Sequence, residues 1–224
     1  MKRNAKYNLC LGIGSILLFI LWTVLVMTAD VKPIGLKGSS VGFATVNSAV
    51  HKLTGANMSL YNVTDWLGLV PILVCFIFAG VGLYQLIKRR SLLKVDKDIL
   101  ILGVYYILVI AAYLIFEMIP VNYRPVLING FMEVSYPSST TLLVLCVMPT
   151  LNFHLDRRIK NKTVRNIINI ISVFFSVFMV IGRLISGVHW LSDIVGSVLI
   201  SLGLFYIYKG VVLSVWNSAE NCSN

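Results

Sequence analysis

A short segment in the C-terminal part of the chain combines a guanidinium, an imidazole and a carboxylate. It contains Arg183, His189 and Asp193, and the last two are four residues apart. If a helix begins near His189, Asp193 lies one turn further along the same face. A carboxylate there can hold one ring nitrogen of the imidazole and leave the other as a nucleophile or base. The spacing therefore predicts a reactive histidine.

An earlier set of polar residues has the properties of a phosphate-binding site. Arg124 supplies a second guanidinium, and the planar donor fork of arginine suits phosphate oxygens. Ser138 and Ser139 stand directly before an apolar stretch. A helix that begins there has free backbone N–H groups and a positive dipole end, which favour an anion. Together with Arg183 and His189, these residues predict a phosphate pocket with a reactive imidazole.

Each residue of this set also has a purely structural interpretation. Single basic residues such as Arg124 and Arg183 commonly anchor a span at the lipid headgroups. Ser138 and Asp193 suit helix caps, and His189 suits an interfacial hydrogen bond beside the following tryptophan. For any one residue the structural interpretation is the commoner one. All of them are expected on the same side of the membrane, and this joint occurrence favours the pocket.

The elements that position these residues are those of a membrane protein. Of the 224 residues, 58% are apolar and 12% are charged, with a mean hydropathy of +0.86. Soluble domains carry about 25% charged residues, so the composition argues against a soluble enzyme, a secreted disulfide domain and a nucleic-acid binder. Because about 20 apolar residues cross a bilayer, the pattern predicts an all-α polytopic bundle of six transmembrane helices, a single membrane domain over residues 1–224. The expected spans cover about 9–29, 66–87, 99–119, 139–153, 167–185 and 193–216.

Most of the 19 Lys and Arg residues cluster before the first expected span, between the second and third, and between the fourth and fifth. The positive-inside rule then places both termini in the cytoplasm of a multi-pass cell-membrane protein. The segments that carry Arg124 and His189 emerge on the extracytoplasmic side, as does an outer loop at 30–65. Within that loop, residues 41–53 are mildly amphipathic and predict an interfacial helix.

These motifs resemble those of the type 2 phosphatidic acid phosphatase (PAP2) superfamily, which shares its active site with vanadium haloperoxidases. That family shows the signatures KxxxxxxRP, PSGH and SRxxxxxHxxxD. The third is nearly intact here, with Gly182 at the serine position followed by Arg183, His189 and Asp193. The other two depart from the pattern, because Glu117 stands at the lysine position and Thr140 at the histidine position.

The resemblance implies a PAP2-like core and a lipid phosphatase mechanism. His189 would attack phosphorus and form a phosphohistidine, with Asp193 orienting it. The phosphoryl oxygens would be bound by Arg124, Arg183, Ser138 and the backbone N–H of Ser139. No cofactor and no metal is indicated, and the expected partners are membrane lipids and a lipid phosphate substrate rather than nucleic acid.

The two departures leave three interpretations open, because Thr140 is a poor proton donor near neutral pH. In the first, the protein hydrolyses a lipid or isoprenoid diphosphate, whose phosphate leaving group needs little help from an acid. In the second, another group supplies the proton, with five candidates: Glu117, Glu133, Tyr123, Tyr136 and His51. In the third, catalysis is lost and the protein binds lipid phosphates or acts as a scaffold. A transporter or channel subunit is a weaker alternative, because most spans lack a central charged residue.

Overall fold

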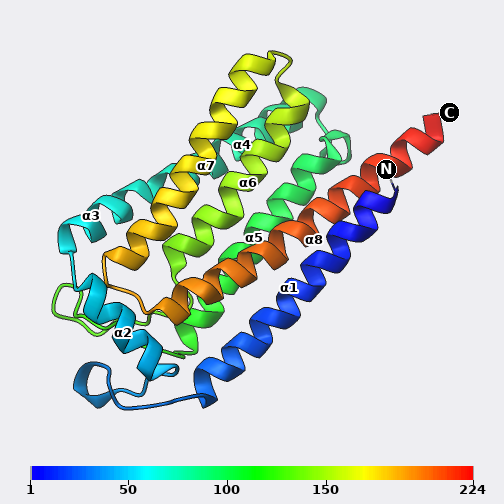
Figure 1. Cartoon of the computed structure of the whole chain (residues 1–224). Coiled ribbons are helices and arrows are strands. Elements are labelled where there is room, and N and C mark those ends of the chain that lie inside the picture. The colour runs from blue at the N-terminus through cyan, green and yellow to red at the C-terminus, as the bar shows by residue number, and fades with distance from the viewer. Residues whose placement is uncertain (1, 224) are drawn as a thin grey trace.

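The computed structural model describes residues 2–223, and within that range the regular structure is entirely helical. Eight α-helices are joined by connections of different lengths, two of which contain a 3₁₀ turn (Figure 1). Their bounds are α1 Lys2–Thr28, η1 Leu36–Gly38, α2 Ala44–Thr54, α3 Met58–Leu67, α4 Leu69–Arg89, η2 Leu92–Lys94, α5 Lys97–Met118, α6 Ser139–Arg158, α7 Lys162–Ile185 and α8 Leu191–Ser223. The expected all-α helical bundle is therefore confirmed.

Helices α1 and α8 run antiparallel along one side of the bundle, with the two ends of the chain close together (Figure 1). Their close approach depends on glycines. A Cβ atom at Gly12 would lie 2.7 Å from the backbone nitrogen of Ile207, and one at Gly203 would lie 3.1 Å from that of Ile16. Small residues at a helix interface let two backbones approach closely, which is a common way of packing helices within a membrane.

Helix α6 is the inner helix of the bundle and packs against α4, α5, α7 and α8. Its buried residues include polar ones, among them Thr140, Thr141, Thr150 and His154. Five other helical segments in the described range are long and apolar enough to cross a membrane, and α6 is not among them. The reason is its position, since a helix surrounded by protein does not need a lipid-facing apolar surface. The expected fourth span at 139–153 is this helix, which continues to Arg158.

The helices extend beyond the apolar stretches that predicted them. For example, α1 begins at Lys2, not near residue 9, and α7 begins at Lys162, not near residue 167. Hydropathy marks the hydrocarbon-crossing part of a helix, whereas the backbone hydrogen bonds continue into the polar residues on either side. The expected bounds were therefore too narrow at these ends.

The expected outer loop at 30–65 contains two helices. Helix α2 covers most of the segment for which an interfacial helix was predicted. Helix α3 was not predicted, and it leads into α4 after Gly68. Its N-terminus is capped by Asn57, whose side chain accepts a hydrogen bond from the N–H of Leu60 at 3.0 Å. This short helix packs against α7 and so reaches the site described below.

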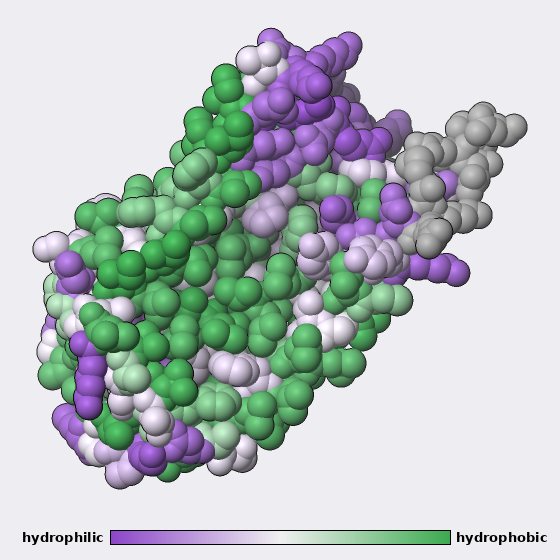
Figure 2. All heavy atoms as spheres, viewed as in Figure 1, coloured by the Kyte–Doolittle hydropathy of each residue, from purple (hydrophilic) through white to green (hydrophobic). Residues whose placement is uncertain are grey.

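The two ends of the bundle are polar and the surface between them is broadly apolar (Figure 2). At one end, Arg158, the last residue of α6, forms an ion pair of 2.7 Å with Asp98 at the start of α5. The α4–α5 and α6–α7 connections therefore lie together, at the same end as both chain termini (Figure 1). The apolar belt and the long apolar helices identify a multi-pass membrane protein.

Candidate active site

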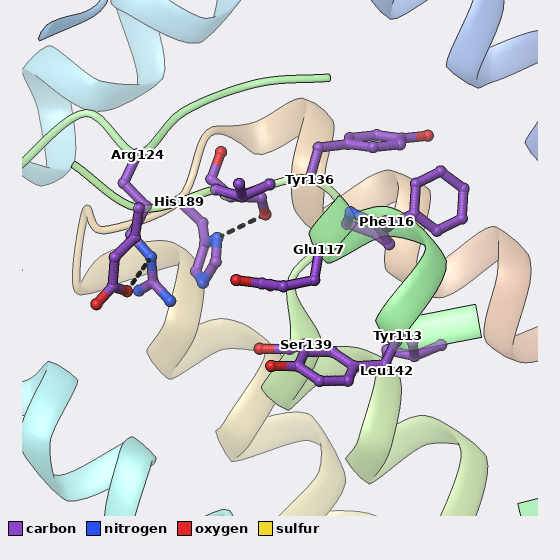
Figure 3. Close-up of a pocket in the computed structure, with 12 residues that line it drawn as sticks. Tyr113, Phe116, Glu117, Arg124, Tyr136, Ser139, Leu142 and His189 are labelled. Atoms are coloured by element: carbon purple, nitrogen blue, oxygen red, sulfur yellow. Dashed lines mark hydrogen bonds and ion pairs between the residues drawn. The ribbon is translucent and has the colours of Figure 1, made fainter. Parts of the chain in front are cut away.

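The opposite end of the bundle holds a polar cavity of about 230 Å³ (Figure 3). Its walls come from the end of α5, the α5–α6 connection, the start of α6 and the α7–α8 connection. The residues that line it are Tyr113, Phe116, Glu117, Arg124, Glu133, Val134, Ser135, Tyr136, Pro137, Ser139, Leu142 and His189. Six of the residues singled out in the sequence therefore meet at one cavity: Glu117, Arg124, Glu133, Tyr136, Ser139 and His189.

The α5–α6 connection folds back on itself as a small hairpin. At its tip, Asn129 and Gly130 have φ angles of +49° and +83°, a conformation that the Asn-Gly pair favours in tight turns. Further down, the N–H of Arg124 donates to the carbonyl of Glu133 at 3.0 Å. This pairing places both side chains at the cavity.

The hydrogen bond of His189 defines the chemistry of its ring. Its Nδ1 lies 3.1 Å from the carbonyl oxygen of Ser135. Because a carbonyl oxygen only accepts, Nδ1 carries the proton and Nε2 keeps its lone pair. Burial lowers the pKa of His189 to about 4, the charges of Arg124 and Arg183 act in the same direction, and Asp193 opposes them. The imidazole is therefore neutral at physiological pH, which is the form that a nucleophile requires.

The α7–α8 connection that carries His189 is held against the segment between α2 and α3. Gly187 has a φ angle of +66°, and a Cβ there would lie 1.6 Å from the carbonyl oxygen of Gly55. Only glycine fits so close to another backbone in this conformation. In the same contact, the N–H of Asn57 donates to the carbonyl of Ser186 at 2.9 Å. These contacts fix the position of the α7–α8 connection where it enters the site.

Asp193 organises the same connection, but it does not hold His189 as the spacing predicted. Its Oδ2 lies 3.8 Å from Nδ1 of His189, beyond hydrogen-bond distance, and the carbonyl of Ser135 takes that proton instead. Oδ2 accepts from the backbone N–H of Trp190 at 2.9 Å and from the Ser135 hydroxyl at 2.7 Å, and Oδ1 accepts from Asn122 at 3.1 Å. The carboxylate therefore caps α8 and fixes the segment that positions the imidazole.

The two arginines meet at one aromatic ring of α3. The guanidinium of Arg183 lies 4.9 Å from the centre of the Tyr61 ring, and that of Arg124 lies 5.7 Å from the same centre. Each also has a carboxylate nearby, Glu133 at 3.2 Å from Arg124 and Asp65 at 3.5 Å from Arg183. Arg183 does not line the cavity itself. It is almost completely buried behind it, with 1% of its side chain exposed.

Several buried nitrogen atoms around the cavity have no hydrogen-bond partner within the part of the chain that is described. They are Nε2 of His189, Nη1 of Arg124, Nε of Arg183 and Nε of Arg124, whose contact with Glu133 is an ion pair without a hydrogen bond. Buried polar groups normally find a partner, because leaving one unsatisfied costs about 1–3 kcal/mol, and more for a charged group. Three of these atoms are nitrogens of cationic guanidinium groups, and the fourth, Nε2 of His189, has a free lone pair. Together they suit an electrophilic group that carries negatively charged oxygens.

Comparison with known protein families bears on this arrangement. Residues 74–216 match the model of the PAP2 superfamily. The chain belongs to the PAP2 superfamily. The matched segment begins within α4 and ends within α8, and it contains every residue of the three motifs. None of the curated proteins matches the chain.

A solved structure supports the same fold for this PAP2 protein. It is the crystal structure of a transmembrane PAP2-type phosphatidylglycerolphosphate phosphatase from Bacillus subtilis. The two folds superpose with a TM-score of 0.67 over 92% of this chain and 97% of the other, at 17% sequence identity. The arrangement of the helices is therefore that of a PAP2 transmembrane protein, although few residues are shared.

The serine-rich start of α6 is only partly directed to the cavity of this PAP2 protein. Ser139 lines it, whereas Ser138 and Thr140 do not. The hydroxyl of Ser138 donates to Thr141 within α6 at 3.1 Å. Thr140 is buried close to Gly68, where a Cβ atom would lie 3.5 Å from its methyl group. Of the first residues of α6, Ser139 is thus the one that borders the cavity.

The expected proton donors differ in their surroundings. The hydroxyl of Tyr136 bonds to Thr23 of α1 at 2.7 Å, away from the cavity (Figure 3). Tyr123 and His51 do not line the cavity, and the His51 ring packs instead against Trp190 with centroids 5.5 Å apart. The remaining two candidates, Glu117 and Glu133, both line it, and Glu133 is the one paired with Arg124.

Sequence reasoning missed four residues that shape the site. Ser135 and Asn122 hold His189 and Asp193, and Tyr61 and Asp65 of α3 contact the arginines. The Asn-Gly pair at 129–130 was an available signal for the hairpin that places Ser135. Tyr61 and Asp65 lie outside the segment that matches the PAP2 model, and no local pattern links them to Arg183.

Proposed function

We propose that this PAP2 protein is a membrane phosphatase that removes phosphate from a lipid phosphate, preferably a lipid or isoprenoid diphosphate. The observation that carries the proposal is the group of unpartnered buried atoms at one cavity, namely the Nε2 lone pair of His189 and the guanidinium nitrogens of Arg124, with the buried guanidinium of Arg183 behind them. A phosphoryl group suits this set, because its electrophilic centre can meet the lone pair of His189 and its negatively charged oxygens can accept from Arg124, with the positive charge of Arg183 close behind.

In the proposed reaction, Nε2 of His189 attacks the terminal phosphorus and the bond to the leaving oxygen breaks. The guanidinium groups balance the charge on the phosphoryl oxygens, which is usually the largest catalytic contribution in such sites. The N-terminus of α6 adds its backbone N–H groups near Ser139. Water then hydrolyses the phosphohistidine and releases phosphate.

A diphosphate is the preferred substrate because its leaving group is itself a phosphate, which departs without much help from an acid. An alkoxide leaving group requires a proton, and a general acid typically contributes about 10²–10⁴-fold to such a step. Thr140 does not line the cavity. Its hydroxyl is also a poor acid, so a lipid monophosphate is expected to react more slowly.

The proposal includes an orientation in the cell membrane. The site lies at the end of the bundle opposite the basic α4–α5 and α6–α7 connections and the termini. With those connections in the cytoplasm, the cavity opens toward the extracytoplasmic leaflet, where it receives lipid headgroups.

A non-catalytic relative that binds lipid phosphates is the second candidate. The observation that favours it is the presence of carboxylates around the site, with Glu133 paired to Arg124, Asp65 beside Arg183 and Glu117 on the cavity wall. These negative charges weaken the attraction for a phosphate dianion. Such a protein would bind a lipid phosphate without releasing phosphate from it.

Phosphate release from purified protein in lipid vesicles distinguishes the two functions. Wild-type protein is expected to hydrolyse a lipid diphosphate faster than the corresponding monophosphate. His189→Ala is expected to lose more than about 10³-fold of this activity, as removal of a nucleophile typically does. Thr140→Ala serves as the comparison variant and is expected to change the rate little. Equal hydrolysis by the wild type and His189→Ala contradicts the proposed nucleophile, whereas saturable binding without any release supports the second candidate.

A further inference from the structure

Glu117 reaches the cavity from a different element than the proposed nucleophile does. It belongs to the last turn of α5 and lines the cavity together with Tyr113, one turn earlier on the same face. His189 comes from the α7–α8 connection. In Figure 3 the Glu117 carboxylate is directed across the cavity toward the imidazole. A phosphoryl group bound to Nε2 of His189 would therefore have this carboxylate on its far side.

The surroundings of Glu117 also differ from those of the other carboxylate in the cavity. Glu133 lies 3.2 Å from Arg124 and its charge is balanced there. Glu117 forms no ion pair with any residue in the described range, and its side chain is exposed. The other titratable groups that line the cavity with it are Tyr113, Arg124, Glu133, Tyr136 and His189. Glu117 is thus the carboxylate that is both directed into the cavity and unpaired.

The second half of the proposed reaction needs a base in that place. Water must attack the phosphorus of the phosphohistidine from the side opposite Nε2, and it must lose a proton as it does so. A threonine hydroxyl such as that of Thr140 is a very weak base, and the carboxylate of Glu133 is neutralised by Arg124. The unpaired carboxylate of Glu117 can accept that proton.

We infer that Glu117 is the general base that activates this water, an assignment that rests on the proposed phosphohistidine mechanism. As the bond from water oxygen to phosphorus forms, a water proton passes to the Glu117 carboxylate. The P–N bond breaks and its electron pair returns to Nε2 of His189. Phosphate leaves, and the exposed Glu117 releases the proton to solvent. The cavity of about 230 Å³ has room for a phosphoryl group and a water, since a water molecule occupies about 30 Å³ in the liquid.

The assignment predicts that Glu117→Gln separates the two halves of the reaction. In rapid mixing with a lipid diphosphate, this variant is expected to release about one equivalent of lipid monophosphate per protein in a burst. Free phosphate then follows at a rate at least about 10²-fold below that of the wild type, the usual cost of losing a general base. The protein is expected to accumulate an alkali-stable, acid-labile phosphoryl group on His189. Glu117→Asp, which keeps a carboxylate, is expected to show a smaller burst and faster turnover than Glu117→Gln.

Glu133→Gln is the matched control, because it removes a carboxylate from the same cavity. It is expected to lower KM by freeing Arg124 and to accumulate no phosphohistidine. If Glu117→Gln turns over at the wild-type rate, or slows without any phosphoprotein while His189→Ala is inactive, the role of Glu117 is overturned and the phosphatase function stands. If the wild type hydrolyses neither lipid, the proposed function fails and the inference fails with it.

Discussion

At the scale of single residues, the site depends on groups that hold His189 on the side of the ring away from Nε2. The Ser135 carbonyl fixes the tautomer, and Asp193 fixes the segment that carries the ring. Neither forms a hydrogen bond with the other ring nitrogen, so Nε2 has no partner among the described residues. The imidazole of His189 is neutral, so its burial near the cationic guanidinium of Arg183 causes no repulsion between like charges.

The lowered pKa of His189 predicts an unusual pH dependence of its reactivity. Acylating reagents attack only the neutral imidazole, which for a pKa of about 4 persists as the pH falls to 5. The acylation rate of the peptide that carries His189, followed by mass spectrometry, should fall less than about twofold between pH 7 and pH 5. An ordinary histidine, with a pKa of about 6.5, loses about 20-fold over the same range. A loss of that size in the folded protein contradicts the assigned environment.

Substitution of Asp193 tests whether it acts by positioning. Asp193→Asn replaces an acceptor by an amide whose NH₂ group faces the donors of Trp190, Ser135 or Asn122. The loop should shift, and because a displacement of about 1 Å can cost about 10²-fold in rate, we expect kcat to fall by about that factor with little change in KM. Asp156→Asn, in an ion pair with Arg165 at the other end of the bundle, is the control. Unchanged kcat for Asp193→Asn excludes the positioning role.

At the scale of elements, the site lies where two connections, α5–α6 and α7–α8, meet the end of α5 and the start of the inner helix α6. Helix α6 is surrounded by α4, α5, α7 and α8, and its first turn borders the cavity. Helix α3 brings Tyr61 to both arginines. The α1–α8 pair supports the start of α8, since Trp22 of α1 donates to the carbonyl of Ser192 at 3.0 Å. The geometry of the site thus depends on helix packing well away from it.

The α1–α8 contact gives a prediction for stability. A Cβ at Gly12 would lie 2.6 Å from a side-chain carbon of Ile207 and 2.7 Å from its backbone nitrogen, whereas one at Gly14 meets nothing within 4 Å. Gly12→Leu must therefore separate the helices, and overpacking of this kind costs about 1–3 kcal/mol. Thermal unfolding in detergent should show a lower melting temperature for Gly12→Leu than for Gly14→Leu. Equal melting temperatures contradict the close contact.

At the scale of the whole molecule, polar groups are divided between the two ends of an apolar body (Figure 2). One end has the basic connections and both termini, and the other has the cavity with its mixture of arginines and carboxylates. The proposed lipid substrate fits this division, because a headgroup at the membrane surface can reach the cavity while the chains stay beside the apolar belt.

The proposed orientation is tested by labelling single cysteines in a variant whose native cysteines are replaced. Leu127→Cys lies in the exposed hairpin near the cavity, and Lys160→Cys lies in the exposed α6–α7 connection. A membrane-impermeant thiol reagent should label Leu127→Cys in intact cells and label Lys160→Cys only after permeabilisation. The reverse pattern contradicts the orientation derived from the basic residues.

The sequence by itself determined the membrane class, the helical bundle and several of the polar residues that line the cavity at one end of it. Hydropathy and charge depend on composition along the chain, and the spacing of Arg183, His189 and Asp193 is local. Both kinds of information can therefore be taken from the sequence without a structure. Helix ends were less predictable, because hydrogen bonding continues past the apolar stretch. Helix α3, with ten residues, is too short to give a span-like signal of its own.

Only the tertiary structure decided which groups meet. The Ser135 carbonyl takes the proton that Asp193 was expected to hold, and Tyr61 brings Arg124 and Arg183 together. The structure also directs Glu117 into the cavity while Thr140 lies outside its lining. These outcomes depend on side-chain directions and on distances between segments that are far apart in the chain. Helix packing determines both, and no local pattern encodes them.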